Sequence, residues 1–209
     1  MVSTRYRKLF SVFLLVPTVL VLVACTDQGI LLKRLSDDEI ILAFGDSLTF
    51  GTGAESSESY PMQLELLTGK RVVNAGKPGE ISTEGLKRLP GLLDIKKPAL
   101  VVLCHGGNDY LRRYDAALTE SNLRSMIAQI KERDIGIVLI GVPKLGFRLE
   151  TAKFYESIAD DFKIPVETRI LSAVLSNNDL KSDQIHPNAD GYRKVAEAIQ
   201  MLLRQTGAI

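Results

Sequence analysis

The stretch IILAFGDS, at residues 40–47, joins a short apolar run to a polar turn. Its first five residues are all apolar, and the run ends at Gly45 without alternation between apolar and polar positions. An unbroken run of this length is typical of a strand buried on both faces, as the strands of a parallel sheet are. The stretch therefore predicts the first strand of an α/β fold, with Asp46 and Ser47 just beyond its carboxyl end.

Similar runs follow along the chain, and each ends at or near a glycine. They are residues 71–74 before Gly76, residues 99–104 before Gly106, and residues 135–140 before Gly141. We interpret all of them as buried strands of the same sheet.

Apolar residues recur at helical spacing between and after these strands. The stripes lie in residues 86–93, 123–130 and 195–203, and Pro90 should kink or divide the first of them. Strands that alternate with helices over short connections predict a three-layer αβα sandwich around a mostly parallel sheet.

Polar residues gather after three of the predicted strands. In open parallel sheets, binding and catalytic sites lie just beyond the carboxyl ends of the strands. We therefore expect the site among the segments Gly45-Asp46-Ser47, Asn74-Ala75-Gly76 and Gly106-Gly107-Asn108-Asp109.

Ser47 is the candidate nucleophile, but a serine hydroxyl needs a base to remove its proton. His186 is the candidate base, and Asp183, three residues earlier, can orient its ring if the segment curls into one turn. The alternative is a helix-capping serine with an unrelated loop histidine.

His105 is the other histidine of the chain and the competing base. No carboxylate stands three or four residues before it. We expect His105 to be structural or to line the wall of the site, and Asp109 to brace its loop.

Acyl transfer also requires hydrogen-bond donors aimed at the developing oxyanion. Gly76 can offer a backbone N–H at close approach, Asn108 can offer its side-chain amide, and the N–H of Ser47 is the third candidate. Ordinary turn chemistry is the alternative explanation for Gly76 and Asn108.

The four segments GDSL at residues 45–48, NAG at 74–76, GGND at 106–109 and Asp183-x-x-His186 resemble, in order, the blocks of the SGNH (GDSL) hydrolases. The similarity runs from about residue 40 to residue 203, and the flanking residues resemble the short branch of bacterial arylesterases and acyl thioesterase–lysophospholipases. The resemblance implies a flavodoxin-like fold with about five strands. It also implies an esterase that cleaves carboxylic esters or thioesters through an acyl-enzyme on Ser47, with Asp183 and His186 completing the triad.

The overall charge excludes one class of partner. The chain has 26 basic and 25 acidic residues, a formal net charge of +1, which argues against a nucleic-acid-binding surface. Ligand spacings typical of zinc and a strand-linked dinucleotide loop are both missing, so we expect no metal and no cofactor. The expected partner is a small acyl-ester substrate.

The pattern of the N-terminal segment predicts a signal peptide. Basic residues in positions 5–8 precede an apolar run at 9–24, which is short for a membrane span. Leu22-Val23-Ala24-Cys25 resembles the lipobox of bacterial lipoproteins, which implies cleavage before Cys25 and lipid on its sulfur. An uncleaved anchor, or a Cys25–Cys104 disulfide, is the alternative.

We therefore expect a signal peptide at 1–24, a tether at 25–38 and one hydrolase domain at 39–209. Lipid attachment would make the chain an exported envelope lipoprotein, at the outer membrane if the cell is Gram-negative, because Thr26 rather than an acid follows the cysteine. The alternative functions are a carbohydrate acetylesterase and a non-catalytic envelope lipoprotein. Tyr110, Arg112 and Arg113 are candidates for the pocket rim, and residues 147–154 for a lid.

Overall fold

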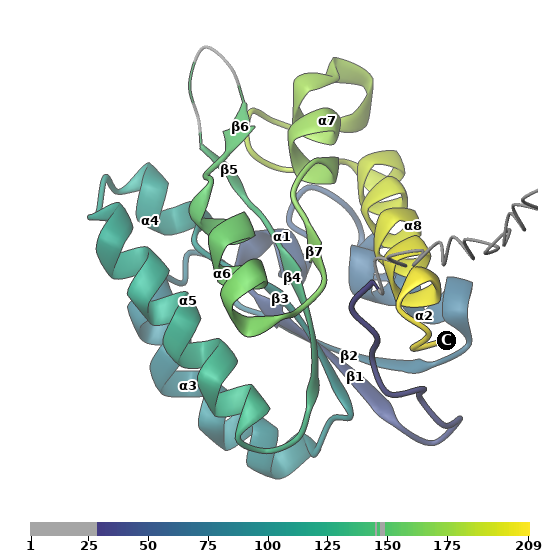
Figure 1. The fold of residues 1–209 in the computed structure, drawn as a ribbon. Coiled ribbons are helices and arrows are strands. Elements are labelled where there is room, and N and C mark those ends of the chain that lie inside the picture. Colours follow the sequence, from purple (N-terminus) through teal and green to yellow (C-terminus); the bar gives the residue numbers. More distant parts are fainter. Residues whose placement is uncertain (1–28, 145, 147–148) are drawn as a thin grey trace, which may run out of the picture.

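A five-stranded sheet forms the centre of the part of the chain that the computed structural model describes, residues 29–144, 146 and 149–209. Every neighbouring pair of strands is parallel, and the spatial order is β2-β1-β3-β4-β7, which confirms the parallel sheet expected from the sequence (Figure 1). The strands are β1 (Ile40–Gly45), β2 (Arg71–Gly76), β3 (Leu100–Cys104), β4 (Gly136–Ile140) and β7 (Val166–Glu167).

The carboxyl ends of four strands lie level with one another, and this fixes the edge at which the site is built. Gly45 at the end of β1 pairs with Gly76 of β2 on one side and with Cys104 of β3 on the other. Cys104 in turn pairs with Ile140 at the end of β4. The residues that follow these strands therefore emerge side by side.

Helices cover both faces of the sheet (Figure 1), as the three-layer prediction required. In one layer α5 packs between α3 and α6, and in the other α8 packs against α2 and α7. Their bounds are α2 (Tyr60–Thr68), α3 (Ser82–Lys96), α5 (Ala116–Lys131), α6 (Phe154–Phe162), α7 (Ile170–Ser176) and α8 (Ala189–Gln205).

Shorter elements connect these layers at the site edge and elsewhere. They are the single-turn helices α1 (Ser47–Phe50) and α4 (Gly107–Leu111), the 3-10 turns η1 (Ser56–Glu58) and η2 (Asn178–Leu180), and the antiparallel pair β5 (Pro143–Lys144) and β6 (Glu150–Thr151). None of the helices within the described residues is long and apolar enough to cross a lipid bilayer.

The three central strands are buried on both faces, as their unbroken apolar runs predicted. All residues of β3 are buried, and in β1 and β4 only the first residue is partly exposed. The prediction was wrong for residues 71–74, because β2 is the edge strand and exposes Arg71 and Asn74. A central strand has a neighbouring strand on each side, whereas β2 pairs with β1 alone, so more of its residues remain exposed.

Two other local features differ from the sequence expectation. Pro90 lies inside α3 but does not divide it, because Leu89 and Leu93 are buried in the core and hold the helix on both sides of the proline. About five strands were expected, but the position of the fifth strand, β7, was not identified from the sequence, because two residues are too few to form a recognisable apolar run.

Candidate active site

Ser47 begins α1 immediately after β1, so its side chain lies at the carboxyl edge of the sheet. Asp46 caps this turn, and its carboxylate accepts the Leu48 N–H at 3.0 Å. Gly45 must lack a side chain, since a Cβ there would collide with the Cys104 carbonyl and the Thr49 hydroxyl. The turn therefore brings β1 against β3 and leaves the serine hydroxyl free to face the site.

His186 and Asp183 approach Ser47 from the loop that precedes α8. His186 Nε2 lies 3.1 Å from Ser47 Oγ, and His186 Nδ1 lies 2.8 Å from Asp183 Oδ2. The other carboxylate oxygen, Oδ1, accepts the backbone N–H groups of Ile185 and His186, each at 2.8 Å. The structure thus brings together the three residues that the sequence proposed as a triad.

The Asp183 carboxyl is held in its ionised form. Partial burial raises its pKa, but the hydrogen bond with the His186 ring and the two backbone N–H donors outweigh burial and lower the pKa below its usual value. An ionised carboxylate behind the ring can stabilise the imidazolium that forms when His186 takes a proton.

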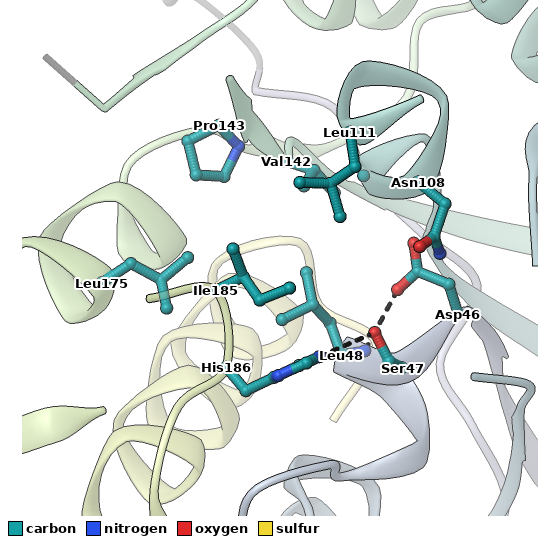
Figure 2. Close-up of a pocket in the computed structure, with 11 residues that line it drawn as sticks. Asp46, Ser47, Leu48, Asn108, Leu111, Val142, Pro143, Leu175, Ile185 and His186 are labelled. Atoms are coloured by element: carbon teal, nitrogen blue, oxygen red, sulfur yellow. Dashed lines mark hydrogen bonds between the residues drawn. The ribbon is translucent and has the colours of Figure 1, made fainter. Parts of the chain in front are cut away.

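A largely apolar pocket that is open to solvent lies beside Ser47 and His186 (Figure 2). Its polar lining consists of Asp46, Ser47, Asn108 and His186. The remaining walls are apolar side chains and one glycine: Leu48, Gly107, Leu111, Val142, Pro143, Leu175 and Ile185. A pocket with few polar groups on one side and aliphatic walls on the other suits an acyl chain attached to a reactive carbonyl.

Asn108, the candidate oxyanion donor, lies in this pocket as expected (Figure 2). It is the second residue of α4, which follows β3. Its Nδ2 donates a hydrogen bond to the Glu80 carbonyl at 3.0 Å, which leaves the second Nδ2 hydrogen for a ligand.

Gly76, the other expected oxyanion donor, does not line this pocket, and its N–H is already bound, which argues against the expected role. Its N–H already donates to Asn74 Oδ1 at 2.9 Å, and it lines a different hollow with Phe50 and Met62. The absence of a side chain is explained by packing, because a Cβ would meet the backbone of Thr49 and Phe50. The close approach expected of this glycine is made to α1 and not to a substrate.

The loop after β2 contacts Asn108 through Glu80, four residues after Gly76, in the turn from Lys77 to Glu80. The Glu80 N–H donates to the Lys77 carbonyl at 3.2 Å, and Gly79 has a φ of 78°, which favours glycine. The Gly79 N–H donates no hydrogen bond to any of the described residues. The sequence signal for this turn is the Pro78-Gly79 pair, which lies outside the four segments that resemble the family blocks.

His105 is structural, as expected. It is fully buried, and both ring nitrogens are engaged away from Ser47. Nε2 lies 3.3 Å from Glu80 Oε2, and Nδ1 accepts the Gly106 N–H at 3.0 Å. Asp109 also does what the sequence indicated, since its carboxylate accepts the N–H and hydroxyl of Ser82 and so braces the start of α3.

Several residues around the pocket were missed or only partly foreseen. Of the proposed rim, Tyr110 and Arg113 line a hollow that shares Leu111 with the main pocket, and Arg112 donates to the Gly79 carbonyl at 2.8 Å. Leu175 and Pro143 had no sequence signal, since they come from separate short elements.

Other sequence predictions fall on residues that the structure does not describe. Cys25, the signal peptide and Phe147 lie outside the described residues, whereas Phe154 begins α6 and stacks on Tyr155. Across residues 29–144, 146 and 149–209, no three His, Cys, Asp or Glu side chains are grouped as metal ligands.

Comparison with known proteins agrees with this geometry. The chain is 31% identical over 172 residues to thioesterase 1/protease 1/lysophospholipase L1 of Escherichia coli (strain K12), over 78% of this chain and 83% of that protein. It is 31% identical over 186 residues to esterase TesA of Pseudomonas aeruginosa, over 84% of this chain and 92% of that protein.

A solved structure and a family profile agree with these relatives. The crystal structure of TesA superimposes with a TM-score of 0.72 at 28% identity, covering 80% of this chain and 99% of that one. The profile of the GDSL-like lipase/acylhydrolase family matches residues 43–194. The chain therefore belongs to the GDSL-like lipase/acylhydrolase family.

Proposed function

We propose that this hydrolase cleaves acyl esters and thioesters through an acyl-enzyme on Ser47. The observation that carries the proposal is the continuous contact from Asp183 Oδ2 to His186 Nδ1, at 2.8 Å, and from His186 Nε2 to Ser47 Oγ, at 3.1 Å, beside an apolar pocket. A capping serine and a loop histidine would have no reason to meet in this way.

In the first half-reaction, Ser47 Oγ bonds to the substrate carbonyl carbon while His186 Nε2 takes the hydroxyl proton. The carbonyl π electrons move to the oxygen, which becomes an oxyanion. When the oxyanion collapses, the bond to the leaving oxygen or sulfur breaks and His186 returns the proton to that atom. The acyl group then remains as an ester of Ser47.

The second half-reaction repeats these steps with water. His186 takes a proton from the water as its oxygen bonds to the acyl carbon, and it then returns the proton to Ser47 Oγ as that bond breaks. The products are the free acid and the original enzyme, and Asp183 keeps one ring nitrogen of His186 oriented throughout.

Three donors are suitable for the oxyanion: the backbone N–H of Ser47, the Nδ2 of Asn108 and the N–H of Gly79. Gly79 takes the place that the sequence had given to Gly76. The support for this exchange is that Glu80, the next residue, contacts the Asn108 amide, whereas Gly76 has its own acceptor.

The pocket walls favour an aliphatic acyl group. Six of the eleven lining residues are Leu, Val, Pro or Ile, and each buried CH₂ of a chain contributes about 0.8 kcal/mol. An acetylated sugar would place hydroxyl groups against these walls without partners. We therefore place alkyl esters and thioesters ahead of the carbohydrate acetylesterase alternative.

A panel of p-nitrophenyl esters and acyl thioesters, from two to sixteen carbons, tests the proposal on wild type and Ser47→Ala. We expect hydrolysis by wild type to rise with chain length before it falls, and the variant to lose at least about 10³-fold in kcat. Ser125→Ala is the matched control, because Ser125 is half-buried on α5, does not line the pocket, and donates to the Ser121 carbonyl. Undiminished hydrolysis by Ser47→Ala would overturn the proposal.

We also propose that the chain is exported and held on a membrane by lipid on Cys25. The support is the LVAC segment after an apolar run. The start of the described chain lies at the C-terminal end of α8, where the Leu32 N–H donates to the Thr206 carbonyl. His186 lies just before the N-terminal end of the same helix. Since a 17-residue helix is about 25 Å long, a tether would join the domain at the end remote from the pocket.

Detergent partition of the full chain expressed in a bacterium tests the anchor. We expect the wild type to enter the detergent phase and to incorporate labelled fatty acid. Cys25→Ala should enter the aqueous phase without label. Equal partition of both proteins, with no label on either, would refute lipidation at Cys25.

A further inference from the structure

Glu80 is an acidic residue whose side chain is completely buried behind the pocket. Its two carboxylate oxygens are bound by one arginine in a two-pronged contact, with Arg88 Nε 2.8 Å from Oε1 and Arg88 Nη2 2.6 Å from Oε2. His105 Nε2 lies 3.3 Å from Oε2. We call these three residues the Glu80 cluster.

The Glu80 cluster joins the ends of three strands. The Arg88 guanidinium lies over the Phe44 ring of β1, 4.3 Å from its centroid, and Nη2 donates to the Gly45 carbonyl at 3.4 Å. His105 directly follows β3, and Glu80 lies in the loop that follows β2. One carboxylate therefore ties together the strand ends from which Ser47, Gly79 and Asn108 extend.

The main chain of Glu80 contacts Asn108, which lines the pocket. Its carbonyl accepts a hydrogen bond from Asn108 Nδ2 at 3.0 Å. An asparagine amide has two Nδ2 hydrogens, so this bond fixes the plane of the amide and aims the second hydrogen. The rotation of the Asn108 side chain is therefore set by the position of the Glu80 carbonyl.

The Glu80 carboxyl is ionised, as its contacts with Arg88 and His105 require. Burial raises the pKa of Glu80, but the contacts with His105 and Arg88 outweigh it and lower the pKa to about 2. The carboxylate is consequently ionised across the pH range in which a histidine base works. Removing one partner of a buried ion pair leaves the other charge buried without compensation, so the ionised cluster holds its three side chains in one arrangement.

We propose that Glu80 is a positioning residue for the reaction: Arg88 and His105 hold its side chain so that its carbonyl orients the Asn108 amide toward the oxyanion. The proposal rests on the assignment of Asn108 as an oxyanion donor. It predicts that damage to the Glu80 cluster lowers kcat through Asn108 and leaves substrate binding largely unchanged.

A double-mutant cycle with Glu80→Gln and Asn108→Ala tests this in the full chain, with a p-nitrophenyl ester as substrate. Loss of one oxyanion donor lowers kcat by about 10²–10³-fold, and we expect that range for Asn108→Ala. For Glu80→Gln we expect a loss of about tenfold in kcat, with KM within about twofold. In the Asn108→Ala background the same substitution should change kcat by less than about twofold, because the donor that it positions is gone.

Asp161→Asn is the matched control. Asp161 also pairs with an arginine, Arg124 Nη1 at 2.8 Å, but on the α5–α6 surface away from the pocket. It should leave kcat and KM unchanged in both backgrounds.

Two results would overturn the inference: an unchanged kcat in Glu80→Gln, or a full tenfold loss that persists in the Asn108→Ala background. The second would show that the cluster acts on the whole fold. If circular dichroism shows that Glu80→Gln does not fold, Arg88→Lys replaces it in the experiment. This variant keeps the positive charge but loses the two-pronged contact with Glu80. The same cycle and the same outcomes then apply to Arg88→Lys.

The proposed function is tested separately by Ser47→Ala and Asn108→Ala in the same assay. Activity retained by Ser47→Ala would refute the acyl-enzyme on Ser47, and the inference would fall with it. Strong losses in both of these variants, with no loss in Glu80→Gln or Arg88→Lys, would refute the inference and leave the proposed function standing.

Discussion

Ser47 Oγ and His186 Nε2 lie 3.1 Å apart although 139 positions separate the two residues in the chain. The contact depends on two local structures. The Gly45–Asp46 turn presents the hydroxyl at the end of β1, and the loop before α8 presents the ring. Ser182 N–H donates to the His186 carbonyl at 3.0 Å, which closes that loop on itself and fixes the ring against the sheet edge.

Asp183→Asn should lower kcat by about 10²–10⁴-fold and change KM little. An amide cannot stabilise the imidazolium, and it favours the wrong tautomer of His186. Stopped assays with a short-chain aryl ester give both constants. Asp190→Asn, in the first turn of α8, is the control for a lost negative charge nearby. Equal activity of the two variants would show that the carboxylate at 183 has no part in the reaction.

The Glu80 carboxyl should contribute stability that depends on pH. Its pKa is about 2 in the folded chain and 4.5 in its ordinary state, so the contribution is complete above pH 4.5 and is lost as the pH falls toward 2. The difference of about two and a half pKa units corresponds to about 3 kcal/mol. Urea unfolding of wild type and Glu80→Gln between pH 6 and pH 2 measures it.

The stability advantage of wild type over Glu80→Gln should therefore shrink as the solution becomes more acidic. A glutamine does not titrate, so every other carboxyl cancels in the comparison of the two proteins. An advantage that stays constant, or that grows with acid, would contradict an ionised and tightly bound Glu80.

Leu111→Ala should change the preference for acyl length. Leu111 lines the pocket and is 43% exposed, so its removal takes apolar contact away from a long chain and leaves the reacting carbonyl untouched. We expect kcat/KM to fall by about tenfold for octanoyl and longer esters, which corresponds to about 1.4 kcal/mol of lost contact, and by less than about twofold for acetyl esters.

Leu118→Ala is the matched control, since Leu118 is 49% exposed and does not line the pocket. It should leave the whole chain-length profile unchanged. A profile for Leu111→Ala that is lowered equally at every length would mean that acyl chains do not occupy the apolar side of the pocket.

Gly76→Ala and Gly79→Ala should fail in different ways. A Cβ at Gly76 meets the backbone of Phe50, so this variant should lose about 1–3 kcal/mol of stability and keep the kcat of its folded fraction. A Cβ at Gly79 would make only an ordinary contact, 3.8 Å from Arg112 Nη2, but Gly79 has a φ of 78°, so alanine there should cost about 1 kcal/mol and lower kcat by shifting the donor N–H. Chemical unfolding and active-site-titrated kinetics separate the two effects. The opposite pattern would indicate that Gly76, and not Gly79, supplies the N–H donor to the oxyanion.

The sequence was sufficient for the central strands and for the meeting of Ser47 with His186. Runs such as residues 100–104 are apolar throughout because both faces of the strand are buried, so pattern and environment agree. Asp183 and His186 are separated by one turn, and local spacing settles their contact without knowledge of the rest of the fold.

The choice between Gly76 and Gly79 could not be made from the sequence. Both follow β2 within a few residues, and only the course of the chain decides which N–H is already bound. Glu80 was missed for the same reason, because its partners Arg88 and His105 come from a helix and from another strand end. Contacts of this kind depend on packing between elements, which neither periodicity nor local spacing reports.

The most direct measurement is the mass of the intact protein after reaction with an alkyl p-nitrophenyl phosphonate, followed by peptide mapping. We expect one adduct per chain, located on Ser47, with labelling slowed by orders of magnitude in His186→Ala. An adduct on another residue, or ester hydrolysis that continues at full rate after Ser47 has been labelled, would show that Ser47 is not the nucleophile.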